Sequence, residues 1–397
     1  MTRKQHTALL LVLGSLTAIG PFSIDMYLPG FPAIARDLQT DMASVALTLT
    51  SYFIGISTGQ LVYGPLLDRY GRKPPLIVGL IIYVAAAVGC ALAPTIEMLI
   101  GLRFLLALGA CVGIVAARAI VRDLFQVEEI ARIFSTLMLV LGISPIIAPS
   151  VGAVMTETYG WRWIFVVLAG IGTVILYGVI RWLQETRKED TTFALHPAYI
   201  VRSYLQVITQ PTFVVYALAS AAASCGLFAY IADAPFVFMK LYGLSEREFG
   251  LTFGLSACGV IGASQLNRLV LRRYGSRIIS LYAVSGQCMF AGALVFAAQS
   301  LAPLAVVTTL IVGYLVCLGF LSPNTTALAI EPFSRGAGTA SALLGSMQMA
   351  AGALGSAVVS WLHTGSAVPM ASVLTAAAVG SLLLQMAHAA RRETSTS

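Results

Sequence analysis

The chain has 397 residues, of which 58% are hydrophobic and 10% charged, and its mean hydropathy is +0.86. A soluble protein of this length needs a larger polar surface, so the composition excludes that class and indicates a membrane protein. The net charge of +7 is carried by short basic clusters between long apolar runs. That pattern is typical of membrane topology and argues against nucleic-acid binding.

Twelve apolar stretches are long enough to cross the hydrocarbon core, which takes roughly 20 residues of helix. They are continuously apolar, whereas the strands of a membrane barrel are short and alternate in polarity. We therefore predict an all-α membrane protein with twelve transmembrane helices. In chain order these cover residues 7–27, 43–66, 75–94, 97–117, 133–155, 162–183, 212–235, 247–267, 278–298, 302–323, 338–361 and 366–388. The first contains Asp25 and is followed by further spans, so we interpret it as a membrane helix rather than a cleavable signal.

The basic residues are distributed unevenly between the two sides of the predicted membrane. With the N-terminus inside, nineteen of the 24 Lys and Arg residues fall on the inner side and four on the outer side. Arg103 lies within a predicted helix. Because basic residues are enriched on the cytoplasmic side, we expect both termini in the cytoplasm and a location in the bacterial inner membrane.

The longest charged break, from Gln184 to Arg202, separates the sixth and seventh predicted helices. It divides the chain into an N-terminal six-helix bundle (1–183), a cytoplasmic linker (184–210) and a C-terminal six-helix bundle (211–397). Two short matches relate the halves: residues 69–73 resemble residues 273–277, and Asp25 corresponds to Asp233. Parallel repeats of this kind are typical of alternating-access carriers, whose substrate site lies between the halves.

The connection between the second and third predicted helices has a charged signature, Gly64-Pro65-Leu66-Leu67-Asp68-Arg69-Tyr70-Gly71-Arg72-Lys73-Pro74. Gly71 allows a tight turn, and Asp68 can accept charge-assisted hydrogen bonds from a helix start or from a basic side chain. The segment resembles the cytoplasmic signature of the major facilitator superfamily. That resemblance implies the major facilitator fold of two six-helix bundles.

Other stretches resemble the bicyclomycin-resistance (Bcr/CflA) family of drug:proton antiporters. They are Ser23–Pro29, Arg103-Phe104 with Gly109, Arg122-Asp123, Pro235-Phe236-Val237 and Ser322-Pro323-Asn324. Taken together, the two resemblances imply a cytoplasmic gate made of Gly64, Asp68, Arg69, Gly71, Arg72, Lys73, Arg122 and Asp123.

The fifth predicted helix carries part of an antiporter pattern, in Gly142, Pro145, Pro149 and Gly152. Ser144, Ala148 and Ala153 stand where antiporters of the superfamily often have Gly. Small residues still allow helices to approach closely, so a simple packing role is the alternative to an export-specific one.

Asp25 and Arg103 are charged residues inside predicted helices. Such a residue at the bilayer centre costs about 2.5–3.5 kcal/mol on insertion scales, so it usually faces a cavity and has a function. The first helix runs outward and the fourth inward, which places the two residues at comparable depth, where an ion pair can form. The family resemblance assigns proton coupling to these positions, and a static salt bridge that fixes packing is the alternative.

Asp233 lies near the outer end of the seventh predicted helix, where solvation is easy. Related proteins usually carry a small uncharged residue there. A solvated surface position and a second acid in the cavity both remain open. Further polar or aromatic side chains are candidates for the substrate cavity, although hydrogen bonds between helices explain them as well: Tyr27, Gln60, Tyr63, Asn324 and Gln348.

The six cysteines lie in apolar segments, without a C-x-x-C pair or a Cys/His cluster. We therefore expect neither a metal site nor a structural disulfide. No cofactor is expected besides protons as the coupling ion.

The resemblance implies a monomeric, proton-coupled exporter of small amphipathic, drug-like molecules that works by alternating access among membrane lipids. An exporter of a native metabolite, such as an amino acid or a small peptide, is the near alternative. An integral-membrane enzyme is disfavoured because the sequence shows no nucleophile with a base, no paired acidic motif and no nucleotide loop. A channel is disfavoured because there is no filter-like repeat.

Overall fold

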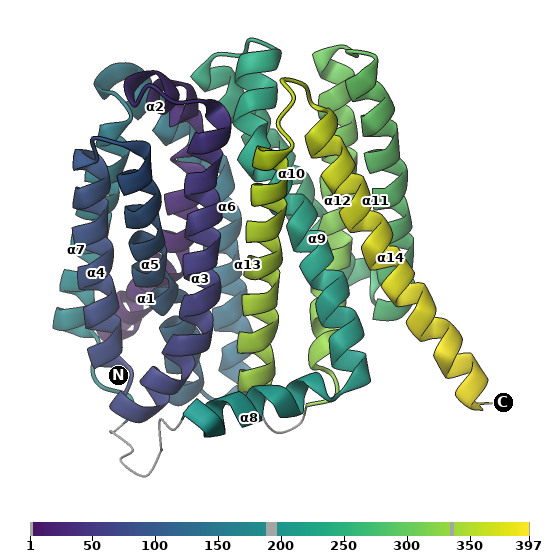
Figure 1. The fold of residues 1–397 in the computed structure, drawn as a ribbon. Coiled ribbons are helices and arrows are strands. Elements are labelled where there is room, and N and C mark those ends of the chain that lie inside the picture. The colour runs from purple at the N-terminus through teal and green to yellow at the C-terminus, as the bar shows by residue number, and fades with distance from the viewer. Residues whose placement is uncertain (1–2, 188–196, 334–336, 397) are drawn as a thin grey trace. The chain divides into compact units, whose positions relative to one another are not determined.

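The computed structural model describes residues 3–187, 197–333 and 337–396. The chain forms two compact units, Met1–Val201 and Arg202–Ser397. The described residues form helices and connecting turns, with no strand among them, which confirms the predicted all-α fold class (Figure 1). The finer division at residues 183/184 and 210/211 stays a prediction, and residues 188–196 of the predicted linker lie outside the described residues.

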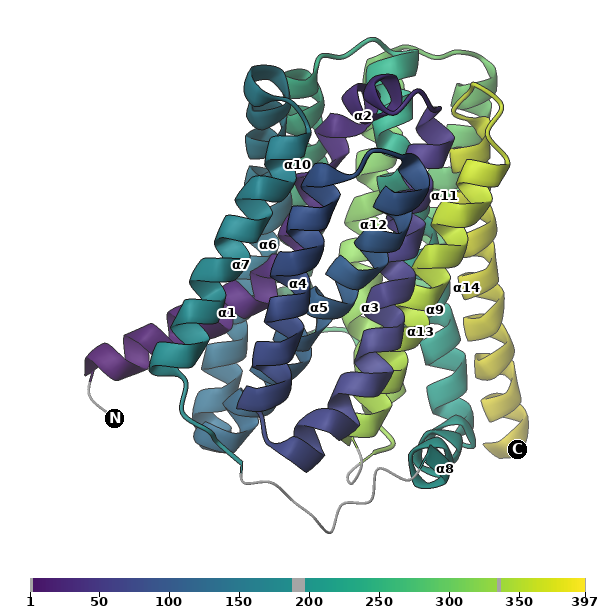
Figure 2. The ribbon, with the colours of Figure 1, turned by 60° about the vertical axis from the view of Figure 1, so that its left-hand side comes forward.

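The first unit contains the helices that carry the signature loop and the first embedded charges. Its helices are α1 (Arg3–Asp25), α2 (Phe31–Asp37), α3 (Met42–Tyr70), α4 (Lys73–Leu92), α5 (Ile96–Leu124), α6 (Val127–Tyr159) and α7 (Arg162–Trp182). A 3-10 turn, Leu28–Gly30, separates α1 from α2. Helices α4 and α7 lie side by side and contact each other (Figure 2).

The second unit begins inside α8 (Pro197–Ile208), a short helix within the predicted linker. Its helices are α9 (Pro211–Pro235), α10 (Glu246–Val270), α11 (Ser276–Gln299), α12 (Leu304–Ile330), α13 (Ala337–Trp361) and α14 (Val368–Thr396). Helix α9 passes directly into a π-helical turn, Phe236–Leu241. Figure 1 shows α13 beside α9, with which it packs extensively.

The same order of helix pairs recurs inside each unit. In the first unit α1 packs on α5, α6 and α7, while α5 packs on α3 and α4, and α4 packs on α7. In the second unit α9 packs on α12, α13 and α14, while α12 packs on α10 and α11, and α11 packs on α14. The two units therefore share one internal packing scheme, in agreement with the short sequence matches between the halves.

The twelve predicted spans coincide with α1, α3 to α7 and α9 to α14. Within the described part of the chain, eleven helical segments are long and apolar enough to cross a membrane. Helices α3 and α5 continue several residues beyond the predicted apolar stretches, to Tyr70 and Leu124. An apolar stretch marks only the part of a helix that lipid can surround, so it misses polar turns at the helix ends. The extra turn of α3 carries Asp68 and Arg69, and the extra turns of α5 carry Arg122 and Asp123.

Candidate functional site

Arg103, on α5, is fully buried in the first unit. Its Nη1 donates a 2.8 Å hydrogen bond to the backbone carbonyl of Ser23, near the end of α1. Its Cζ lies 4.4 Å from the ring centroid of Tyr27 and 4.5 Å from that of Tyr52. Among the described residues, its Nε and Nη2 have no hydrogen-bond partner. The cation is therefore held by two aromatic faces and one carbonyl.

The two tyrosines are fixed by hydrogen bonds of their own. Thr48 donates a 2.9 Å bond to the Tyr27 hydroxyl, and the Tyr52 hydroxyl donates a 3.1 Å bond to the carbonyl of Gly20. Tyr27, Tyr52 and Arg103 are all fully buried, so the rings and the guanidinium form one buried cluster. We call Arg103, Tyr27, Tyr52 and the Ser23 carbonyl the Arg103 cluster.

Asp25 is the last residue of α1 and is 5% exposed. The expected ion pair with Arg103 is absent: none of the ion pairs between described residues involves Asp25. Ser144 of α6 lies beside the Asp25 carboxyl, but its buried hydroxyl forms no hydrogen bond with a described residue. Helix α1 packs on both α5 and α6, so Arg103 and Ser144 approach it from different neighbours. Asp25 and Arg103 were expected to pair because they lie at comparable depth in the membrane. Comparable depth alone does not bring two side chains into contact.

Helix α6 approaches the end of α1 very closely. A Cβ atom added to Gly152 would overlap the backbone carbonyl of Met26, the residue after Asp25. Pro149 is buried one turn earlier, while Gly142 and Pro145 are half-buried. The predicted antiporter-pattern residues thus include a close contact between α6 and the Asp25 segment. Their role in export stays a prediction.

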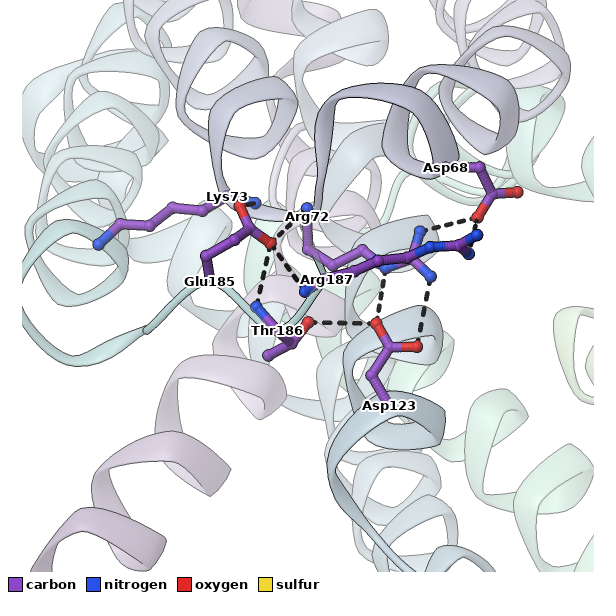
Figure 3. A network of polar contacts seen from close by, with 7 residues as sticks. All are labelled: Asp68, Arg72, Lys73, Asp123, Glu185, Thr186 and Arg187. Atoms are coloured by element: carbon purple, nitrogen blue, oxygen red, sulfur yellow. Dashed lines mark hydrogen bonds and ion pairs between the residues drawn. The ribbon is translucent and has the colours of Figure 1, made fainter. Parts of the chain in front are cut away.

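The signature loop and its surroundings form a polar network, which we call the Arg72 network: Asp68, Arg72, Lys73, Asp123, Glu185, Thr186 and Arg187 (Figure 3). The Arg72 side chain, 5% exposed, forms an ion pair with Asp68 at 2.8 Å and another with Asp123 at 2.7 Å. Burial lowers the pKa of Arg72, but hydrogen bonds to Asp123 and Asp68 more than offset this, so its pKa is raised. Arg72 therefore remains a cation and joins the end of α3 to the end of α5.

Glu185 binds the start of α4 through its carboxylate. Oε1 accepts a 2.7 Å hydrogen bond from the Arg72 backbone N–H, and Oε2 accepts one of 3.0 Å from that of Lys73. A carboxylate at this position satisfies free donors at a helix N-terminus and complements the helix dipole. Gly71 has a φ of +84°, and an added Cβ would collide with Glu185 and the Arg187 carbonyl. Glycine is therefore required at position 71 both by the positive φ of the tight turn and by the lack of space for a side chain.

The segment that follows α7 completes the network. The Thr186 hydroxyl donates a 3.1 Å hydrogen bond to Asp123, and Arg187 Nη1 lies 3.0 Å from Asp68 Oδ1. We expected Asp68 to accept hydrogen bonds either from the start of a helix or from a basic side chain. In the structure its partners are the basic side chains of Arg72 and Arg187. Sequence reasoning assigned residues 185–187 to a linker, because their charges suggested only a cytoplasmic connection.

Lys73 makes a further contact, and three other residues of the predicted gate, Arg69, Arg122 and Gly64, lie outside the Arg72 network. Lys73 Nζ donates a 3.1 Å hydrogen bond to the Ile180 carbonyl of α7, and the Arg69 guanidinium lies 5.8 Å from the ring centroid of Tyr70. Arg122 is exposed, and an added Cβ at Gly64 would meet no atom within 4 Å. Of the predicted gate residues, Asp68, Arg72, Lys73 and Asp123 form the polar contacts drawn in Figure 3.

Two candidates for the substrate cavity make hydrogen bonds between helices. Asn324 Nδ2 donates to Asn267 Oδ1 at 2.8 Å, which joins α12 to α10, and Gln348 Nε2 donates to Ser220 Oγ at 2.7 Å, which joins α13 to α9. Tyr27 belongs to the Arg103 cluster. Asn267 was missed in the sequence, although an Asn inside a predicted helix was a visible signal. Substrate contacts of these residues stay a prediction.

Gln60 and Tyr63 lie on α3, one half-buried and the other 8% exposed. The Tyr63 hydroxyl lies close to Gly79 of α4, where an added Cβ would be 3.2 Å from it. The substrate contact of Gln60 and Tyr63 stays a prediction.

Asp233, on α9, is buried, with only 5% of the residue exposed. The solvated surface position that the sequence left open is therefore wrong for this residue. An outer-end position on a helix does not by itself give solvent access, because neighbouring helices can cover it. Whether Asp233 acts in transport stays a prediction.

Comparison with known proteins gives a consistent result along the chain. Residues 13–356 match the sequence model of the Major Facilitator Superfamily. An uncharacterized MFS-type transporter of Bacillus subtilis, YdgK, is 34% identical over 388 residues, which cover 96% of this chain and 95% of that protein. A bicyclomycin resistance protein homolog of Haemophilus influenzae is 30% identical over 384 residues, 96% of each chain.

The solved structures that match agree in fold. A crystal structure of a D-xylose-proton symporter superposes with a TM-score of 0.75 at 15% identity, covering 95% of this chain and 96% of that one. At this identity the likeness concerns the fold alone.

Proposed function

Because the chain belongs to the major facilitator superfamily, and is therefore a multi-pass membrane transporter rather than an enzyme, we propose that it is a proton-driven exporter of small amphipathic, drug-like molecules. The relative named for bicyclomycin resistance supports antibiotic export, since the likeness to it extends over 96% of both chains. Both termini and the Arg72 network would lie in the cytoplasm of the bacterium, and the spans in its inner membrane. The uneven distribution of basic residues supports that orientation.

The observation that carries the proposal is the environment of Asp25. Its carboxyl is buried at the end of α1 and forms no ion pair with a described residue, although Arg103 lies nearby on α5. An ionised carboxylate in such a place is costly unless a proton or a cation neutralises it. A proton arriving from outside would bind this carboxyl and leave it to the cytoplasm as the carrier changes state. Substrate export would use the other half of the cycle.

Arg103 would act on Asp25 through the helix end rather than through a direct pair. Its Nη1 holds the carbonyl of Ser23, two residues before Asp25. A change of charge on Asp25 changes the electrostatic field at a guanidinium that two aromatic rings keep in place. The position of the end of α1 would thus depend on whether Asp25 carries a proton.

Transport into proteoliposomes tests the proposal. Purified protein is reconstituted and bicyclomycin uptake is followed with the interior held acidic relative to the exterior, then without a pH difference. We expect accumulation only with the gradient, and Asp25→Asn to retain downhill exchange while losing accumulation. Glu97→Gln, which removes an exposed carboxylate at the start of α5, is the matched control and should behave as wild type. Wild-type uptake that ignores the gradient would refute proton coupling, and uptake of amino acids in place of bicyclomycin would indicate a metabolite exporter.

A further inference from the structure

Each unit carries a buried acid at a break in its first membrane helix. In the first unit α1 ends at Asp25, before the 3-10 turn at Leu28–Gly30. In the second unit Asp233 stands two residues before Pro235, where α9 gives way to the π-helical turn at Phe236–Leu241. Pro235 has no N–H, so the carbonyl of Ile231 lacks its usual helical donor. Single π-helical turns occur frequently at functional sites.

Asp233 has no charged partner on the helices that surround it. Helices α12, α13 and α14 pack on α9, and their residues 304–330, 337–361 and 368–390 contain no Asp, Glu, Lys or Arg. The described residues make neither an ion pair nor a hydrogen bond with the Asp233 carboxylate. In the first unit α5 supplies Arg103, but α12, which takes its place in the packing scheme, supplies no cation.

The other charged or basic groups near this end of α9 lie toward the surface, while the phenol of Tyr230, one turn before Asp233, is buried. Lys240, on the π-helical turn, is exposed, and the ring of His363 packs 4.3 Å from that of Phe236. The start of α10, which contacts the turn, adds Glu246, Arg247 and Glu248. Arg247 and Glu248 are exposed, and Glu248 accepts hydrogen bonds from Ser245 in a capping box. These groups leave the buried carboxylate of Asp233 uncompensated.

An uncompensated carboxylate in an apolar surrounding is far less costly with a proton bound. We propose that Asp233 is a second proton-coupling carboxyl, an inference that rests on the proton-driven export proposed above. The carrier then exchanges two protons for each substrate, and each unit binds one of them. The proton binds the Asp233 carboxylate when the site opens to the outside and leaves it when the site opens to the cytoplasm. Asp25 remains the group whose proton exchanges with substrate, so Asp25→Asn uncouples the whole cycle, and the proton on Asp233 adds driving force only while that exchange operates.

The number of coupled protons fixes how steeply the substrate accumulates. With an uncharged substrate and the membrane voltage held at zero, each coupled proton supports about a tenfold gradient per pH unit, and two support about a hundredfold. The test uses the full-length protein in proteoliposomes containing potassium and valinomycin, a pH difference of about one unit and bicyclomycin, an uncharged antibiotic. We expect about hundredfold accumulation for wild type and about tenfold for Asp233→Asn.

Controls separate this inference from the proposed function. Glu331→Gln removes an exposed carboxylate of the same unit and should keep the hundredfold ratio. Asp233→Ser replaces Asp233→Asn if the latter does not fold, as judged by size-exclusion chromatography. Wild type and Asp233→Asn both accumulating about tenfold would overturn the second proton while leaving proton-driven export intact. Absence of any pH-driven accumulation in wild type would overturn both.

A measurement without substrate examines proton binding directly. A protonated carboxylic acid has a carbonyl stretching band in the infrared that a carboxylate lacks. During a pH titration of the purified protein, Asp233→Asn should remove one such band that wild type and Glu331→Gln retain. Identical difference spectra for wild type and Asp233→Asn would show that Asp233 does not exchange a proton, and would overturn the proposal.

Discussion

Arg103 is a buried cation that aromatic faces and a backbone carbonyl compensate. The Cζ lies 4.4 Å and 4.5 Å from two tyrosine ring centroids, and its one described hydrogen bond is to Ser23. A guanidinium suits such a place because it is planar and more weakly hydrated than an ammonium group. The residue thus contributes shape as well as charge.

This geometry predicts that Arg103→Lys is not a conservative change. Lysine keeps the charge but cannot stack a flat group against Tyr27 and Tyr52 while it reaches the Ser23 carbonyl. We expect gradient-driven transport to fall about tenfold or more, corresponding to about 1.4 kcal/mol or more in activation free energy. Transport rates at equal reconstituted protein check this. Normal transport by the lysine variant would show that the charge alone matters at this position.

Glu185 offers a second prediction for a single residue. Its two carboxylate oxygens accept hydrogen bonds from the first N–H groups of the turn into α4, so Glu185→Gln removes one acceptor and the favourable charge. We expect the free energy of unfolding in detergent to fall by about 1 kcal/mol, the usual cost of losing a helix cap. Glu331→Gln, at an exposed acid at the C-terminal end of α12, is the control. Equal stability of the two variants would contradict a capping role.

At the level of helices, the contact between α6 and the end of α1 depends on one glycine. An added Cβ at Gly152 would overlap the backbone carbonyl of Met26, which cannot move without shifting the segment next to Asp25. We therefore expect Gly152→Ala to lower both thermal stability and transport. Gly170→Ala on α7 is the matched control, because an added Cβ there meets no atom within 4 Å. Similar melting temperatures and transport rates for the two alanine variants would show that α6 can retreat without consequence.

Features that depend on residues close together in the sequence could be predicted, whereas contacts between residues far apart in the sequence could not. The helices could be predicted because each is a continuous apolar run, and Gly71 because the turn is local. The contact from Glu185 to Arg72 could not be predicted, since the two residues are 113 positions apart and are brought together by folding. The pairing of Asp25 with Arg103 was inferred from depth, which says nothing about the direction in which a side chain leaves its helix.

For the whole molecule, the two sites of the first unit are connected by one helix. Helix α5 carries Arg103 near one end and Asp123 near the other, roughly 30 Å apart at 1.5 Å per residue. Arg103 contacts α1, and Asp123 contacts the turn between α3 and α4. A rigid helix can therefore transmit a displacement between the Asp25 end and the Arg72 network.

The separation of these sites predicts different effects on binding and on transport. Asp68 forms ion pairs with Arg72 and Arg187, and Asp68→Asn weakens both while leaving the distant Arg103 cluster in place. We expect the equilibrium affinity for bicyclomycin to change less than about twofold and net transport to fall about tenfold or more, because the barrier between states changes rather than the binding site. Equilibrium binding to purified protein and transport in proteoliposomes measure the two quantities on one preparation. Loss of binding with a normal cycling rate in the remaining active protein would show that Asp68 supports the substrate site and that the Arg72 network is not a gate.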